Sequence, residues 1–99
     1  MIDLLSKIYV DLNELVIRRV PHDKEILSTR VIKEHTKICE YCFNIKNSNK
    51  DKNYMLEFKV SIKYILFILN YFVSKKIINN DIYKIIEKEY KDLYYIINP

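Results

Sequence analysis

The chain of 99 residues contains no glycine. Glycine lets the backbone approach a phosphate group closely and readily adopts the positive φ angles of tight hairpin turns. The composition therefore excludes a Walker loop and a dinucleotide-binding fingerprint, and it disfavours an all-β architecture with many tight turns. It leaves long helices joined by polar turns as the way to build a core.

Apolar residues recur at intervals of three and four along almost the whole chain, as in helices that each bury one face. The segment 54–62 alternates loosely and could form a strand, but no other segment would pair with it. Because short connections make neighbouring helices antiparallel, we expect a single all-α domain over 1–99, an antiparallel up-down-up-down four-helix bundle. Its helices are predicted at about residues 3–19, 23–44, 52–76 and 80–97.

Several local features predict where the helices end. Val20 stops the first helix because a residue before proline is pushed out of the α region. Residues 44–53 are rich in Asn and Lys and are predicted to form a linker. Residues 64–73 are apolar on nearly every face, which predicts that the third helix is central and heavily buried. The predicted N-caps are side chains that can accept an orphan backbone N–H: Asp3, Asp23 and one of Asn79, Asn80 and Asp81.

The charge is mild, with 17 Lys and Arg residues against 13 Asp and Glu residues, a formal net charge of +4. Because both signs are interleaved, we expect only weak attraction to an anionic membrane surface and no nucleic-acid partner. The longest apolar stretch, 64–73, is about half as long as a bilayer span. Charged residues interrupt the apolar residues at the N-terminus, so no signal peptide is expected. The sequence predicts a soluble cytoplasmic protein.

Three residues that can ligate a metal fall on one face of the second predicted helix: His35, Cys39 and Cys42. A structural zinc site usually has four ligands and includes a turn, and His22 is the remaining candidate ligand. The two cysteines also form a C-x-x-C pattern, but a redox motif belongs at a helix N-terminus. We favour packing roles for both cysteines and expect no cofactor, with a metal site at these three residues as the alternative.

Arg30 and His35 fit the spacing R-x4-H, which resembles the core of the catalytic motif of HEPN ribonucleases. Those enzymes are all-helical bundles that cleave RNA without a metal, usually across a dimer. The resemblance implies that His35 acts as general acid and base and that Arg30 stabilises a pentavalent phosphate. It covers six residues, and Val31 stands where the family has a polar residue. The alternative is a surface Arg30 and a His35 hydrogen-bonded at the helix seam.

The layout resembles the immunity proteins of pediocin-like (class IIa) bacteriocins, which are small, basic, cytoplasmic four-helix bundles. Segment 5–12 is similar to the first helix of that family and segment 22–26 to a helix start, and segment 69–93 carries most of the resemblance. The chain ends at Pro99 without the tail common in the family, which leaves target specificity open. The matching residues in segment 69–93 are Tyr71, Phe72, Ser74, Lys75, Lys76, Ile77, Ile78, Ile82, Tyr83, Ile86, Lys91 and Leu93.

The resemblance implies a non-enzymatic protein that confers bacteriocin resistance from the cytoplasm. It would bind a mannose phosphotransferase permease once the bacteriocin has docked, and so block the pore. Its mild positive charge would favour peripheral association with the anionic inner leaflet. A phage- or virus-encoded helical interaction protein is a further alternative. We expect the partner to bind exposed parts of the third and fourth helices, at Lys75, Lys76, Tyr83, Tyr90, Tyr94 and Tyr95.

Overall fold

The computed structural model describes residues 1–47 and 52–99, and within these ranges all regular secondary structure is helical. The predicted all-α class with four helices is therefore confirmed, and segment 54–62 is helical rather than extended. A short 3-10 helix, η1, separates the first two long helices. The elements are α1 (Ile2–Arg19), η1 (His22–Lys24), α2 (Glu25–Asn47), α3 (Lys52–Ser74) and α4 (Asn80–Ile97).

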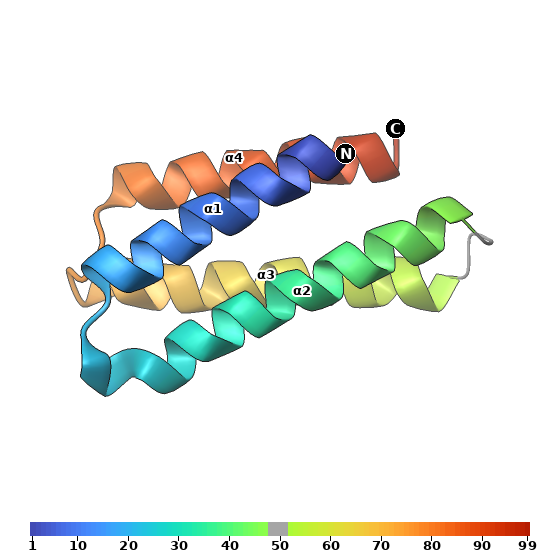
Figure 1. Cartoon of the computed structure of the whole chain (residues 1–99). Coiled ribbons are helices and arrows are strands. Elements are labelled where there is room, and N and C mark those ends of the chain that lie inside the picture. The colour runs from blue at the N-terminus through green and yellow to red at the C-terminus, as the bar shows by residue number, and fades with distance from the viewer. Residues whose placement is uncertain (48–51) are drawn as a thin grey trace.

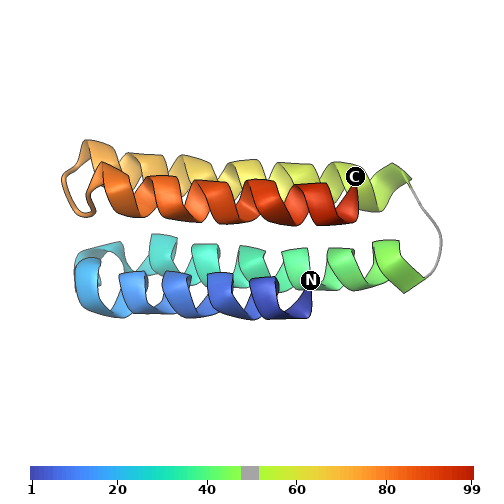
Figure 2. The same ribbon diagram turned by 90° about the horizontal axis from the view of Figure 1, so that it is seen from above.

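The four long helices lie along one axis of a molecule with principal extents of 40 × 23 × 20 Å. Both termini lie at one end, and the α1–α2 and α3–α4 connections lie at the other (Figure 1). Viewed from above, α1 lies over α2 in one layer and α4 over α3 in the second (Figure 2). Each helix thus has two neighbours and one side that faces away from the bundle.

A single core runs between the helices and is built from the predicted apolar stripes. His35 and Tyr90, which also belong to those stripes, lie inside it. The buried hydrophobic residues are Leu5, Ile8, Leu12, Leu15, Val31, Ile38, Cys42, Phe58, Ile65, Ile68, Leu69, Phe72, Ile78, Ile86, Tyr90 and Leu93.

The prediction that α3 is central and heavily buried is only partly correct, because the helix keeps an exposed side. Phe67 is 73% exposed, Asn70 is exposed, and Leu56 and Val60 are exposed further towards the N-terminal end of the helix. The physical reason is geometric, because a helix at the corner of a four-helix arrangement contacts two neighbours and keeps an outer side. The apolar run therefore leaves some of its side chains in water.

Two of the predicted helix ends are confirmed. Val20 has φ −95° and ψ 124°, the extended conformation expected before Pro21. Asn79 is the N-cap of α4, and its side-chain oxygen accepts a hydrogen bond from the backbone nitrogen of Ile82 at 2.9 Å. The polar residues before α4 thus provide the cap that the sequence predicts.

The other predicted ends need correction. Asp3 is not an N-cap, because α1 begins at Ile2 after Met1, and Asp3 instead places its charge in the first turn. Asp23 lies inside η1, so it does not directly precede α2. The predicted linker 44–53 is too long, since α2 continues to Asn47 and α3 begins at Lys52. Residues 48–51 of that linker lie outside the described residues.

The end of α3 shows how a chain without glycine closes a helix. The helix stops at Ser74, two residues earlier than predicted, and Lys76 has φ 60°, alone among the described residues in the left-handed region. The Ile77 nitrogen donates to the Phe72 oxygen at 2.9 Å, and the Lys76 nitrogen donates to the Val73 oxygen at 3.0 Å. These two bonds form a Schellman motif, in which glycine is the usual left-handed residue.

Replacing Lys76 with glycine is expected to stabilise the protein. A residue with a Cβ atom pays a steric cost in the left-handed conformation, and glycine avoids it. After subtracting the greater freedom that glycine gives the unfolded chain, we expect the free energy of unfolding to rise by about 0.5–1 kcal/mol. Chemical denaturation measures the change. The control Ser74→Gly, inside the helix, should lower stability, and equal losses in both variants would contradict the assignment.

Candidate functional site

A groove of about 380 Å³ runs between α3 and α4 and combines an apolar floor with a rim of lysines. Apolar clefts with a few placed polar groups are the usual form of binding sites in proteins. We call this site the α3–α4 groove. It is lined by Lys59, Ile62, Lys63, Leu66, Glu87, Tyr90, Lys91, Tyr94 and Tyr95.

The rim of the α3–α4 groove has an excess of positive charge. Lys59 and Lys63, from α3, form no ion pair with any described residue. Lys91, from α4, lies 3.9 Å from Glu87, and that carboxylate is also 3.5 Å from Lys84. One shared carboxylate cannot neutralise the lysines around it, so the groove favours a partner that carries negative charge.

Packed aromatic rings form one wall of the groove. The Tyr94 ring stacks on the buried Phe58 ring, with centroids 6.2 Å apart and an interplanar angle of 8°. Asn98 donates a side-chain hydrogen bond to the Tyr94 hydroxyl at 3.0 Å, and this bond, with help from Lys59, lowers the pKa of Tyr94. Tyr95 meets Tyr94 edge to face and is 68% exposed. The wall thus presents aromatic area that is already in place before binding.

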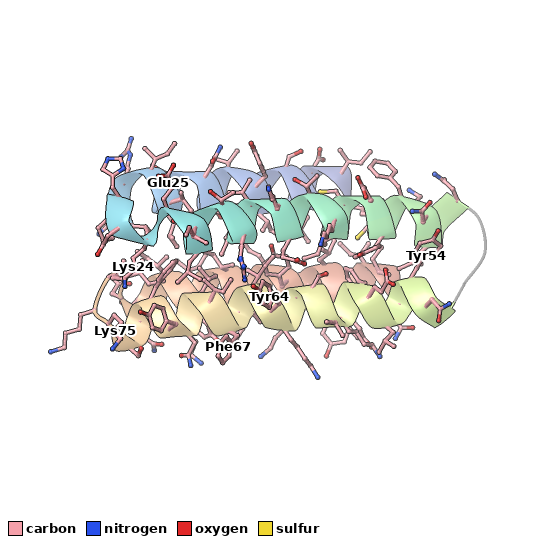
Figure 3. All side chains as sticks on the ribbon, turned by 90° about the horizontal axis from the view of Figure 1, so that it is seen from below. Lys24, Glu25, Tyr54, Tyr64, Phe67 and Lys75 are labelled. Carbon is pink, nitrogen blue, oxygen red and sulfur yellow. The ribbon has the colours of Figure 1, made fainter. Side chains whose placement is uncertain are left out.

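The six residues predicted to bind a partner do not form one patch. Tyr94 and Tyr95 line the α3–α4 groove, whereas Tyr83 is half-buried and donates its hydroxyl to Glu87 at 3.3 Å. Lys75 and Lys76 are exposed in the connection that precedes α4, whereas Tyr94 and Tyr95 lie near the C-terminal end of that helix. Figure 3 shows Lys75 at the end of α3.

The prediction that Tyr90 contacts a partner at the surface is wrong, because its side chain is only 1% exposed. Its ring lies under the floor of the groove, and its hydroxyl faces inward, 2.8 Å from His35 Nδ1. Tyrosine at helical spacing can serve the core or the surface, and here burial raises the pKa of Tyr90 well above its ordinary value. It supports the site without presenting its hydroxyl to a partner.

His35 is held by two hydrogen bonds in the core. Its Nε2 lies 3.0 Å from the Leu5 carbonyl oxygen, which can only accept, so Nε2 carries the proton. Nδ1 of the neutral ring is then an acceptor, and the Tyr90 hydroxyl donates to it. Burial lowers the pKa of His35. Both nitrogens are occupied in a neutral imidazole, which fits the predicted role of a hydrogen-bonded seam residue.

The structure does not bring Arg30 and His35 into a shared cleft. Arg30 is exposed and donates from Nη1 to the Tyr64 hydroxyl at 3.0 Å, whereas His35 is 1% exposed and points to Tyr90. Figure 3 places Tyr64 on the side of α3 that faces α2. The geometry that the ribonuclease hypothesis requires is therefore absent from the described chain, because a general acid must reach the substrate.

The alternative metal site at His35, Cys39 and Cys42 is not formed. Within residues 1–47 and 52–99, no three His, Cys, Asp or Glu side chains are placed to hold a metal ion. Burial raises the pKa of Cys42 to about 12 and also raises that of Cys39, which keeps both as thiols. His22, considered as a fourth ligand, is exposed in η1. Cys42 belongs to the core, and Cys39 packs against it.

A second groove, of about 400 Å³ between α1 and α4, differs from the first in its charge balance. Lys7 lies 2.9 Å from both Asp11 and Glu89, and Arg18 lies 3.4 Å from Glu14. Both signs are present there and pair with each other, so this groove has little preference for a charged partner. The α3–α4 groove is the stronger candidate site.

The groove residues that the sequence did not predict lie on α3 and α4: Lys59, Ile62, Lys63, Leu66, Glu87 and Lys91. On α3, their spacing of three and four predicts a common side of the helix. Which part of α4 lies opposite that side depends on how the two helices pack, and no local pattern encodes it.

Acid should destabilise the protein through His35. Because its folded pKa lies below its ordinary value of 6.5, the unfolded chain binds the proton more readily. The free energy of unfolding should therefore fall as the pH drops through 6.5, by at most about 1.4 kcal/mol per pH unit. Denaturation at several pH values measures this slope.

The variant His35→Leu isolates that contribution. Glu89 has the opposite effect on the pH dependence of stability, because burial raises its pKa above 4.5. The stability of the protein therefore falls, through this group, as the pH rises above that value. In His35→Leu the loss of stability between pH 6.5 and lower pH should be smaller than in the wild type. An unchanged slope would show that His35 is not buried as a neutral ring.

Comparisons with protein-family models, curated proteins and solved structures give no significant match. Among the described residues, no helix has both the length and the apolar character that crossing a membrane requires. The fold and the site together define an all-α protein with a preformed groove that is bordered by lysines.

Proposed function

We propose that this protein is a recognition module that binds its partner through the α3–α4 groove, and that it does not catalyse a reaction. The scaffold would be an antiparallel up-down-up-down four-helix bundle, whose packed core holds the groove rigid. The observation that carries the proposal is the groove itself, in which Lys59 and Lys63, which form no ion pair with described residues, flank ordered aromatic rings. Rigid aromatic anchors beside charged rims are typical of recognition surfaces.

We propose, more particularly, a cytoplasmic immunity protein against a pediocin-like bacteriocin. Its partner would be the mannose phosphotransferase permease after the bacteriocin has docked, and binding would block the pore. Support comes from segment 69–93, which carries the family resemblance and also supplies Glu87, Tyr90 and Lys91 to the groove. Peripheral association with the anionic inner leaflet would keep the protein close to this partner.

Expression in a bacteriocin-sensitive strain tests the proposal. We expect the wild-type protein to raise the inhibitory concentration of at least one member of a panel of pediocin-like bacteriocins. The variant Lys91→Glu/Tyr95→Ser, altered on the α4 wall of the groove, should lose most of that protection. The variant Lys33→Glu on the exposed side of α2 is the control and should protect normally. Absence of protection across the whole panel would refute the immunity proposal.

A further inference from the structure

The positive charge of this chain is concentrated in and after α3. Residues 58–80 contain four lysines and no acidic residue, and the net charge of the whole chain is +4. The remaining residues therefore carry no net charge. A stretch of chain with lysines and no carboxylates is expected to be drawn towards negatively charged surfaces. The four lysines are Lys59, Lys63, Lys75 and Lys76.

The side of α3 that faces away from the bundle is apolar as well as basic. Leu56, Val60 and Phe67 are 61%, 56% and 73% exposed, and their spacing of four and seven residues puts them in one line along the helix. Lys63 falls within that line, and Lys59 stands beside it. Figure 3 shows Phe67 on the outer edge of α3, opposite the side that holds Tyr64. We call Leu56, Lys59, Val60, Lys63 and Phe67 the α3 outer face.

The carboxylates of Glu57 and Glu87 do not neutralise the α3 outer face. Glu57 interacts with Tyr41 of α2, on the other side of α3. Glu87, in the groove next to the face, is already shared between Lys84 and Lys91. Lys59, whose ammonium lies 5.5 Å from the centre of the Tyr94 ring, and Lys63 thus have no carboxylate partner among the described residues.

We propose that the α3 outer face binds the surface of an anionic phospholipid bilayer. Leu56, Val60 and Phe67 would enter the boundary between headgroups and acyl chains, while Lys59 and Lys63 contact lipid phosphates. The apolar residues span about 16 Å of a convex helix surface, a shape that lies flat on a bilayer. Basic helices with an exposed apolar line bind membranes in this way.

The inference deepens the proposed function and rests on it for the membrane at which the protein works. It adds the surface by which the protein attaches, which shares Lys59 and Lys63 with the groove that would hold a protein partner. It does not depend on which bacteriocin is involved, so it can be tested with the purified protein and lipid alone.

Co-sedimentation with lipid vesicles tests the inference. We expect the full chain to bind vesicles of equal parts phosphatidylglycerol and phosphatidylcholine, to bind phosphatidylcholine vesicles much more weakly, and to dissociate as salt is added. Each lysine near the surface adds about 1 kcal/mol, or about fivefold in affinity. The variant Lys59→Glu/Lys63→Glu should therefore bind at least about twentyfold more weakly. Phe67→Ser should lose about tenfold, from the apolar area that no longer enters the interface.

Lys33→Glu/Lys37→Glu is the matched control, because it changes the net charge equally on the exposed side of α2. This variant should keep most of its binding. An equal loss in the control, or equal binding to uncharged vesicles, would overturn the inference. Binding to a soluble acidic helical peptide without binding to vesicles would do so too, and would assign the face to a protein partner.

The two proposals fail in distinguishable ways. Protection of cells without any vesicle binding would contradict the lipid-binding face alone. Vesicle binding that needs Phe67 and Lys63, without protection against any bacteriocin in the panel, would contradict the immunity function alone. All the altered residues are exposed, so each variant is expected to fold. A melting curve of each variant checks this.

Discussion

Replacing Tyr90 with alanine is expected to lower the free energy of unfolding by about 3–5 kcal/mol. The ring is 1% exposed and sits in the core beneath the α3–α4 groove, so its removal leaves a cavity that the helices cannot fully close. The hydrogen bond to His35 is lost as well. Small domains are stabilised by only about 5–15 kcal/mol, so this variant should be close to unfolding at ambient temperature.

Two further variants separate the ring from its hydroxyl. Tyr90→Phe keeps the ring but leaves Nδ1 of His35 buried without a donor, which should cost about 1–3 kcal/mol. Adding His35→Leu removes the unsatisfied nitrogen, so the double variant should lose less than the sum of the two single losses. Urea denaturation of all four proteins gives the coupling energy. If Tyr90→Phe were as stable as the wild type, the buried hydrogen bond would not exist.

The second large effect concerns two phenylalanines on the same helix. Phe58 is fully buried and stacks on Tyr94, whereas Phe67 is 73% exposed. We expect Phe58→Ala to cost about 3–5 kcal/mol, and Phe67→Ala to change stability by less than about 0.5 kcal/mol.

The two substitutions remove the same atoms from the same residue type, so the comparison reports directly which side of α3 faces the core. Guanidinium denaturation of both variants is sufficient. Equal losses would mean that α3 is buried all round, as its apolar run suggests, and would place the outer face in the interior. A larger loss of stability for Phe67→Ala than for Phe58→Ala would mean that α3 turns the opposite side towards the core.

Much of the fold follows from local sequence patterns. The spacing of Leu5, Ile8, Leu12 and Leu15 predicts the buried side of α1, and all four are in the core. The joints also follow from local chemistry, since Val20 before proline is extended and Asn79 caps α4. In these cases the interactions that decide the structure lie within one turn of the residue concerned.

The rest depends on how the helices pack. In segment 64–73 almost every residue is apolar, so its pattern gives no direction, and only the positions of α2 and α4 decide that Phe67 faces water. The groove also requires that Lys63 of α3 lie across from Lys91 of α4, which is set by the register of two helices. Likewise, the left-handed residue that ends α3 is Lys76, although Asn is better suited to that conformation than Lys.

The central claim is that this protein works by binding through the α3–α4 groove and not by cleaving RNA through Arg30. The most direct test compares two variants in the same protection assay. Arg30→Ala removes an exposed side chain outside the groove, and it should protect cells as well as the wild type does. Lys91→Glu/Tyr95→Ser, altered in the groove alone, should fold normally and lose most of the protection. Loss of protection in Arg30→Ala, with full protection in the groove variant, would contradict the account.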